Sequence, residues 1–282
     1  MLHNEHYKVV HYWENSEDVF SNVDIKGGIA ISLWDEKQMF GEIGVFTPYS
    51  ELRSIMQKVL KDDFKPFSEI VYPRDLYRLS DVLYKDNPWA EERPSKGHKY
   101  DVGSNVFDVF PELFHDDEPS GEGFVRVIGR HRSGGRFYKW IKQDYLRVPD
   151  NFDTYKVFVA KANGAGTLGE ALSTPVVGEP FVGHTVTFLS IGKFDRIEEA
   201  NAVLKYIKTK FARIMLGTLK VTQDNPRETW GNIPMQDFTE TSDIDWNATI
   251  DDIDEQLFSK YQLDEDERNF IRETAQTMND EA

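Results

Sequence analysis

The chain has 282 residues, of which 39% are hydrophobic and 13% aromatic, enough for one large domain or two small ones with a packed core. It contains no cysteine, which excludes disulfides and thiolate metal sites. Its first residues do not resemble a signal peptide, and no apolar run reaches the roughly 18 residues of a membrane span. We therefore expect a soluble cytoplasmic protein without membrane partners.

The formal net charge of −16 would repel nucleic acid if it were spread evenly, but it is not. Residues 236–282 hold 15 acidic and three basic residues, whereas residues 124–147 hold seven basic residues and one acidic residue. Because local charge decides where a polyanion docks, DNA remains a possible partner.

The first third of the chain alternates strand-like and helix-like patterns. β-branched and aromatic residues over 7–13 predict a strand. Two extended runs within 23–34 meet at a glycine pair, which indicates a hairpin or a sharply bent strand. We expect a further short strand over 44–46, then helices over about 50–61 and 74–85.

The middle of the chain is predicted to be loops followed by strands. Residues 86–122 are polar and contain several Pro and Gly, so we expect loops with one short element near 105–114. The basic stretch 124–147 is expected to form strands around a turn at 133–135, where the sequence reads Ser-Gly-Gly.

The second half is predicted to contain two strands and then three helices. Their expected ranges are 156–160, 184–191, 196–216, 249–261 and 265–278. Apolar residues repeat at helical spacing throughout 196–216, and Asp264 and Glu267 have the spacing of a capping box. The pattern as a whole predicts an α+β fold: a mixed or antiparallel sheet, packed helices and a C-terminal acidic helical hairpin.

A glycine motif follows the strand expected at 156–160. Gly164, Gly166 and Gly169 match the G-x-G-x-x-G pattern of dinucleotide-binding loops, which requires a helix to begin at the motif. Pro175 and Pro180 would interrupt that helix almost at once. We favour a backbone loop whose amide groups could approach a DNA phosphate.

Two acidic or histidine-containing stretches suggest metal sites, but each has a simpler explanation. Acidic residues of 243–254 fall at EF-hand ligand positions, but Ala248 stands where the turn needs glycine and Asp254 is too short for a bidentate ligand. Helix capping near Thr249 explains these acids better. The histidines of 3–11 have no fixed facing geometry, so no metal site is predicted.

No complete catalytic motif is present. The pair Pro149-Asp150 lacks the D-x-K or E-x-K sequence of a metal-dependent nuclease. Residues 87–90 read Asn-Pro-Trp-Ala and lack the second proline of the Asn-Pro-Pro-aromatic tetrad of amino-methyltransferases.

The strongest positive signal is the interleaving of aromatic side chains with seven cations within 124–147. On a strand, Arg136, Tyr138, Trp140 and Lys142 would share one face. Arginine offers a planar fork that matches guanine or phosphate, and aromatic rings offer stacking surfaces. The alternative is a solvated sheet with cation–π pairs that binds nothing.

Several stretches together resemble a known family, the type IIG-like restriction–modification enzymes with a γ-class N6-adenine DNA methyltransferase domain. Residues 22–28 (NVDIKGG) with 33–35 resemble the closing strands of that methyltransferase domain. Residues 155–166 (YKVFVAKANGAG) are similar to the core of the target-recognition domain that follows it. Three further stretches resemble later parts of the same domain: residues 206–213, residues 221–226 with Trp230, and residues 233–238.

The resemblance implies a division of the chain and a role. Residues 1–47 would be closing strands of a truncated methyltransferase-like domain, 48–235 a DNA target-recognition domain, and 236–282 an acidic helical appendage. The catalytic half, with its S-adenosylmethionine and Mg²⁺, would lie in a partner domain, and this chain would hold no cofactor. Its role would be to recognise duplex DNA and position the target for adenine-N6 methylation or cleavage.

The residues expected to contact DNA come from the basic stretch, the glycine loop and a later segment. They are Arg126, Arg130, Arg132, Arg136, Tyr138, Lys139, Lys142, Lys161, Asn163, Gly164, Lys220 and Gln223, with Lys208 and Lys210 as weaker candidates. Two other functions stay open. One is an acidic protein-interaction or DNA-mimic module, and the other is a methyltransferase or nucleotide-using enzyme built on the glycine loop.

Overall fold

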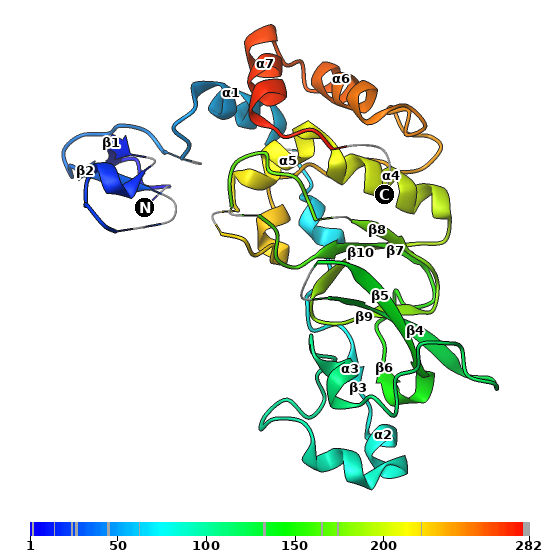
Figure 1. Ribbon diagram of the computed structural model, residues 1–282. Helices are drawn as coiled ribbons and strands as arrows, with labels where there is room; N and C mark the ends of the chain where they lie inside the picture. Colours follow the sequence, from blue (N-terminus) through cyan, green and yellow to red (C-terminus); the bar gives the residue numbers. More distant parts are fainter. Residues whose placement is uncertain are drawn as a thin grey trace.

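The computed structural model describes residues 1, 3–13, 15–23, 25, 28–43, 46–61, 63–131, 134–164, 166–173, 175–220 and 222–278. Within these ranges the chain forms seven α-helices, five short 3-10 helices and ten strands arranged in four small sheets (Figure 1). The 3-10 helices are Ser16–Asp18, Phe67–Ile70, Pro88–Glu92, Gln143–Tyr145 and Arg227–Trp230. The predicted α+β class is confirmed.

A three-stranded antiparallel sheet lies at the centre, in the order β10-β7-β8. Its strands are β7 (Tyr155–Ala160), β8 (Val176–Gly178) and β10 (Phe188–Phe194), and helix α4 (Ile197–Lys208) packs against all three. Strand β7 is buried along nearly its whole length, as expected for an apolar strand covered on both faces. The strand predicted at 156–160 is confirmed.

A second sheet, β5-β4-β9, is mixed. Strands β4 (Phe124–Arg130) and β5 (Arg136–Lys142) form the antiparallel ribbon predicted for the basic stretch, and β9 (Val182–His184) lies parallel to β4. Of the predicted turn, residue 133 lies outside the described residues. A small pair, β3 (Arg78–Leu79) with β6 (Leu146–Arg147), forms the third sheet.

The single strand predicted at 184–191 is wrong, because the chain passes there from one sheet to the next. The Thr185 amide donates to the Ile128 carbonyl in the second sheet. The Phe188 amide then closes a turn by donating to the Thr185 carbonyl, and β10 begins in the central sheet. Extended segments on both sides of a tight turn give the same apolar pattern as one strand.

The long helix predicted at 196–216 is two helices, α4 and α5 (Lys210–Gly217), broken at Thr209. Thr209 is extended, and its hydroxyl accepts a hydrogen bond from the Ala212 amide at the start of α5. The Asp254 carboxylate accepts the amides of Lys210 and Phe211 at 2.9 Å each. The helical period continues across the break because both helices bury their apolar faces in one core.

The helix predicted at 74–85 is shorter than expected. Only α2 (Asp81–Asp86) is helical, since residues 78–79 pair with β6 and the Leu79 amide donates to the Tyr100 carbonyl. The loops predicted for 86–122 are present, with the short α3 (Val106–Val109) where one short element was expected, but the 3-10 helix Pro88–Glu92 was not predicted.

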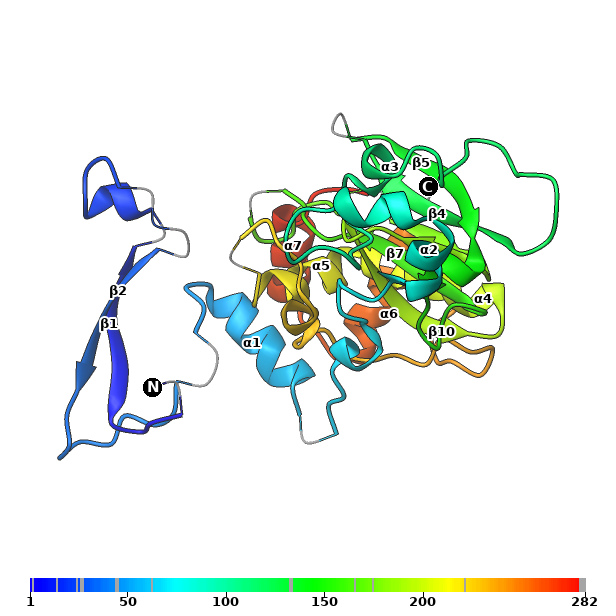
Figure 2. The ribbon, with the colours of Figure 1, turned by 90° about the horizontal axis from the view of Figure 1, so that it is seen from below.

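The N-terminal part is a two-stranded antiparallel ribbon that stands apart from the rest of the molecule (Figure 2). Strand β1 (Tyr7–Trp13) is confirmed. Of the two extended runs expected within 23–34, the second is confirmed as β2 (Ile29–Trp34), which pairs with β1. Residues 24, 26 and 27, which include part of the expected glycine joint, lie outside the described residues. The short strand predicted at 44–46 falls largely on residues outside the described ones.

Helices α1 (Ser50–Val59), α6 (Ile250–Lys260) and α7 (Glu265–Thr274) agree with their predicted ranges. The capping box of Asp264 and Glu267 is present at the start of α7. Lys58 of α1 lies 2.5 Å from the buried carboxylate of Glu267, so the two helices are joined by an ion pair.

The main hydrophobic cluster draws residues from α1, the central sheet, α4, α5, α6 and α7, and Trp230 is fully buried in it. A second cluster joins α2, α3 and one face of the β4–β5 ribbon. The proposed divisions after residues 47 and 235 stay predictions. No helix in the described part of the chain has both the length and the apolar character needed to cross a membrane.

Candidate nucleic-acid interface

The register of the β4–β5 ribbon separates its two faces. Arg126 lies opposite Trp140, and Tyr138 lies on the same face two residues away. The Arg126 guanidinium is 5.4 Å from the centre of the Tyr138 ring and 5.8 Å from that of Trp140, so cation–π contacts hold it over these rings. Lys142 is exposed, Arg136 half-buried, and both belong to this face.

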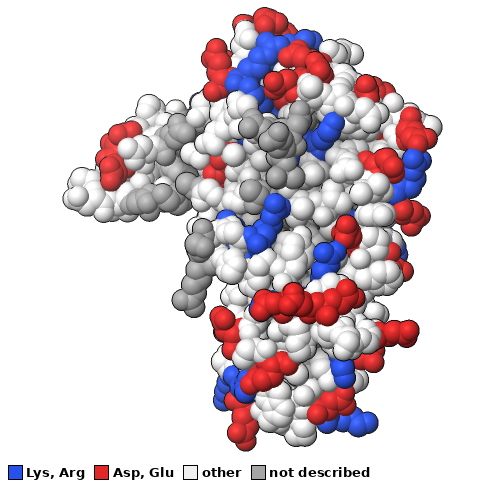
Figure 3. Space-filling model, turned by 45° about the vertical axis from the view of Figure 1, so that its right-hand side comes forward, with Lys and Arg blue, Asp and Glu red and all other residues white. Residues whose placement is uncertain are grey.

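Carboxylates from neighbouring loops pair with several of the predicted cations. Arg126 pairs with Glu179, and Lys139 pairs with Asp116, at 2.5 Å in each case. Figure 3 likewise shows Lys and Arg interspersed with Asp and Glu on the face that it displays. The surface is therefore not a field of one sign.

Two hollows meet at the loop that precedes α3, and both are lined by Ser104 and Asn105. The smaller has a volume of about 400 Å³ and is also lined by Lys161. The larger, of about 1100 Å³, is lined by Arg130 and Lys139. Three residues predicted from distant parts of the sequence are thus brought around one loop, which we call the Asn105 loop (residues 103–105).

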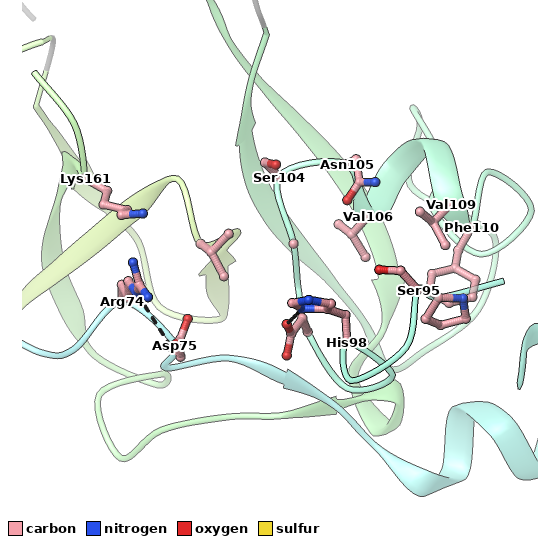
Figure 4. Close-up of a pocket in the computed structure, with 14 residues that line it drawn as sticks. Arg74, Asp75, Ser95, His98, Ser104, Asn105, Val106, Val109, Phe110 and Lys161 are labelled. Atoms are coloured by element: carbon pink, nitrogen blue, oxygen red, sulfur yellow. Dashed lines mark hydrogen bonds and ion pairs between the residues drawn. The ribbon is translucent and has the colours of Figure 1, made fainter. Parts of the chain in front are cut away.

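Figure 4 presents the smaller hollow, which we call the Asn105 pocket. Arg74 and Lys161 lie on one side, and Ser95, His98 and Phe110 lie on the other. The Lys161 side chain projects from the end of β7, where its backbone amide donates to the Thr187 carbonyl and its carbonyl accepts the Asn225 amide. Backbone hydrogen bonds to two segments therefore fix the position from which Lys161 reaches the pocket.

Two of the residues predicted to contact DNA lie inside the protein. Asn163 and Lys220 are buried, and the Lys220 ammonium donates to the Asn163 carbonyl at 2.7 Å and pairs with Glu170. Burial lowers the pKa of Lys220 to about 8. The Asn163 amide group donates to the Ala171 carbonyl at 2.6 Å. These contacts give both side chains a structural role.

The glycine loop does not fit a dinucleotide. The amides of Gly166 and Thr167, which would have to bind a pyrophosphate, donate instead to the Glu170 carboxylate at 3.1 and 3.3 Å. No helix begins among the described residues 166–173, and the next element is a strand. Gly164 is exposed with φ of +60°, and a Cβ there would collide with the Glu170 carboxylate. The chain's own carboxylate therefore occupies the anion-binding amides of the loop.

The remaining predicted residues lie outside these hollows. Gln223 is exposed, Lys208 is buried, and the Lys210 ammonium donates to the Arg272 carbonyl. Arg132 lies outside the described residues. Thr249 caps α6 by accepting the Asp252 amide, as the helix-capping interpretation predicted. No group of three or more His, Cys, Asp or Glu placed to hold a metal occurs within the described ranges.

Sequence reasoning missed Arg74, Ser95, His98, Ser104 and Asn105. Apart from Arg74 they belong to the polar region 86–122, which is predicted as loops with one short element near 105–114. No spacing or periodicity in that region distinguishes a cavity wall from a solvent-exposed turn. The only available signal was the length of the loop region, since long ordered loops often carry function.

No protein-family model matches the chain, and neither does any curated protein. Among solved structures, the type IIG restriction endonuclease BpuSI aligns over 92% of this chain with 10% identity and a TM-score of 0.34. The chain spans 38% of that structure's length. At this TM-score the likeness establishes neither a shared fold nor a shared function.

Proposed function

We propose that this chain recognises a sequence in duplex DNA and positions the site for a catalytic partner of a restriction–modification enzyme. The observation that carries the proposal is the gathering of Arg74, Arg130, Lys139 and Lys161 around the Asn105 loop. These cations come from four separate segments and flank one polar loop. Reading a duplex requires cations that bind backbone phosphates and, between them, polar side chains that reach the base edges.

The two kinds of residue would divide the work. Arg130, Lys139 and Lys161 would contact phosphates, which fixes the register of the protein on the duplex but carries no sequence information. Asn105 would read a base edge, because its amide can both donate and accept and so matches adenine with two hydrogen bonds. Ser104, its neighbour, offers a further donor and acceptor.

Ion pairing within the protein shapes the expected affinity. A DNA phosphate reaching Lys139 would replace the Asp116 carboxylate, so one charge-assisted contact is exchanged for another. Non-specific attraction is then weak, in keeping with the net charge of −16. Tight binding should require base contacts at the preferred site.

The N-terminal ribbon supports the second half of the proposal, a catalytic partner. A two-stranded ribbon is only marginally stable alone, yet Ile31, Leu33 and Trp34 of β2 are 52%, 42% and 51% exposed. Apolar side chains on both faces are typical of a strand inside a covered sheet. We therefore propose that the sheet of the catalytic domain covers this ribbon, and that S-adenosylmethionine and Mg²⁺ belong to that domain.

Replacing Ile31 and Leu33 together by aspartate should abolish association with the catalytic domain, supplied as a separate subunit, without unfolding the body of the protein. The two side chains make no contact with either main hydrophobic cluster, so the melting temperature should not change. Size-exclusion chromatography of the mixed subunits measures the association. Replacing exposed Val82 of α2 by aspartate is the matched control. Unimpaired association of the double variant would contradict the proposed docking role.

The DNA-binding half is tested by anisotropy on a labelled duplex obtained by site selection with the full chain. Lys161→Ala should weaken binding to all sequences and lower the slope of log K against log salt by about 1. Asn105→Ala should lower discrimination at one base pair by about 1–3 kcal/mol while leaving the salt slope unchanged. Lys260→Ala serves as control, since that lysine pairs with Asp243 and lines neither hollow.

If all three substitutions changed binding equally, or if none of them changed it, the role of the Asn105 loop in DNA recognition would be contradicted. Absence of binding to any duplex, with and without the catalytic subunit, would favour the acidic-module alternative. Against that alternative, carboxylates of α7 and the preceding turn already pair with cations of this chain, as with Lys58 and Arg272.

A further inference from the structure

We propose that the Asn105 pocket receives a single nucleotide, its base against the apolar side and its phosphate between Arg74 and Lys161. The proposal rests on the proposed function, since the nucleotide would be one that leaves the stack of the bound duplex. Nothing in the sequence indicates such a pocket, because its walls come from segments around residues 74, 94–110, 161 and 186.

The size of the pocket excludes a duplex and suits one nucleotide. Its volume of about 400 Å³ lies in the roughly 300–1,000 Å³ range of small-ligand sites. A duplex can only lie across the mouth of such a pocket. Chemical groups deep in the pocket therefore become accessible to DNA only if a nucleotide rotates out of the helix.

One wall is suited to the flat face of a base. Val106 and Phe110 line the pocket but are almost fully buried, so they support this wall and offer little surface of their own. The apolar surface open to a base comes from Val109 and Val186, which are partly exposed. An unstacked base loses apolar contacts with its neighbours, and these side chains would replace them.

Polar groups line the rest of the pocket, among them the carboxylates of Asp75 and Asp101. Ser95, Ser104 and Asn105 provide hydroxyl and amide groups. The ring of His98 is held by a 2.7 Å contact between its Nδ1 and Asp101, and Asp101 also pairs with Arg78 at 2.9 Å. Donors and acceptors held in place beside an apolar wall are the usual makings of a specific small-ligand site.

Two cations are placed for a phosphate. Arg74 and Lys161 lie on the side of the pocket opposite His98 and Ser95 (Figure 4). Among the described residues Lys161 makes no ion pair, and Arg74 makes only a long one, 3.7 Å, with Asp75. This differs from Arg126 and Lys139, whose carboxylate partners lie at 2.5 Å. Neither cation at the pocket is held by a close carboxylate of the described residues, so both can pair with a ligand's phosphate.

The neighbouring hollow favours DNA over a free nucleotide as the source. It adjoins the pocket across Ser104 and Asn105 and supplies Arg130 and Lys139. A strand whose extruded nucleotide enters the pocket would continue past the Asn105 loop, where these two cations could hold its next phosphates. A free mononucleotide in the pocket has no second phosphate group along a strand for these two cations to bind.

The test uses the full chain and the selected duplex, with a base analogue that fluoresces when unstacked, such as 2-aminopurine, placed at each position in turn. One position should brighten several-fold on binding. Ser95→Trp, which fills the pocket from its exposed side, should remove the increase and leave anisotropy-measured affinity within about tenfold. Ser259→Trp, an equally exposed change on α6, should behave like the wild type.

Each outcome decides the proposal. A duplex that binds without brightening at any position overturns the pocket while leaving DNA recognition intact. If no duplex binds, adenosine monophosphate is titrated directly. If adenosine monophosphate binds and both Lys161→Ala and Ser95→Trp abolish that binding, the pocket holds a free nucleotide. DNA recognition is then overturned. Absence of both kinds of binding overturns both proposals.

Discussion

Replacing Arg213 by methionine should lower the free energy of unfolding by about 3–5 kcal/mol, the range typical of breaking a buried charged network. Arg213 is fully buried in α5, and its guanidinium donates to the carbonyls of Lys208 at 3.1 Å, Gly169 at 2.8 Å and Gln276. Burial lowers the pKa of the side chain to about 10, so it is still charged at neutral pH. Methionine has similar length but no donor, so all three hydrogen bonds are lost, although the Gly169 carbonyl still accepts the Gln276 amide.

Urea unfolding followed by circular dichroism measures the change as a shift of the transition midpoint. Arg196→Met is the matched control, because Arg196 is half-exposed and pairs with Glu240 on the surface. Surface pairs of this kind contribute about 0–1 kcal/mol. If both variants lost the same small amount, the three carbonyl contacts of Arg213 would not be important for stability.

The second large effect is a pH dependence that originates in Asp254. Burial raises the pKa of its carboxyl to about 6, against the downward influence of the amides of Phe211 and Lys210 and of the charge on Arg213. The folded protein therefore binds this proton more tightly than the unfolded chain, whose carboxyl titrates near pH 4. Its contribution to stability is fully present below about pH 4 and is lost as the pH rises to about 6.

Asp254→Asn replaces the carboxyl by a neutral group of the same shape and should remove this dependence. The unfolding free energy of the variant relative to the wild type should move in the variant's favour by up to about 3 kcal/mol between pH 4 and pH 7. Urea unfolding at unit pH intervals measures the difference. Asp266→Asn, which removes an exposed carboxylate of α7, is the control. A difference that stayed constant with pH would show that folding does not raise the pKa of Asp254.

The elements that local sequence determined are those whose signals lie within a few residues. The strand at 7–13, the paired strands of the basic stretch, helix α1 and the capping box of α7 follow from periodicity, turn residues and the spacing of Asp264 and Glu267. Such features are formed by neighbours in the chain, so the sequence carries their full description. The cations and rings of β4 and β5 were found for the same reason.

The tertiary structure decided what depends on distant partners. The break at Thr209 requires the Asp254 carboxylate to cap α5 from another helix, and the helical period runs through the break unchanged. Asn163 and Lys220 read as surface polar residues until Glu170 and the surrounding backbone enclose them. Burial is a property of the packed molecule, and no local pattern encodes it for a polar side chain.

The candidate site shows the same division. Charge and aromatic content alone pointed to Arg130 and Lys139, and the resemblance added Lys161. Their meeting with Ser104 and Asn105 depends on hydrogen bonds between segments, such as those that fix the backbone of Lys161 to Thr187 and Asn225. The sequence thus determined which side chains could bind a polyanion. Folding decided which of them share a surface, because a pocket is formed by residues that are neighbours only in space.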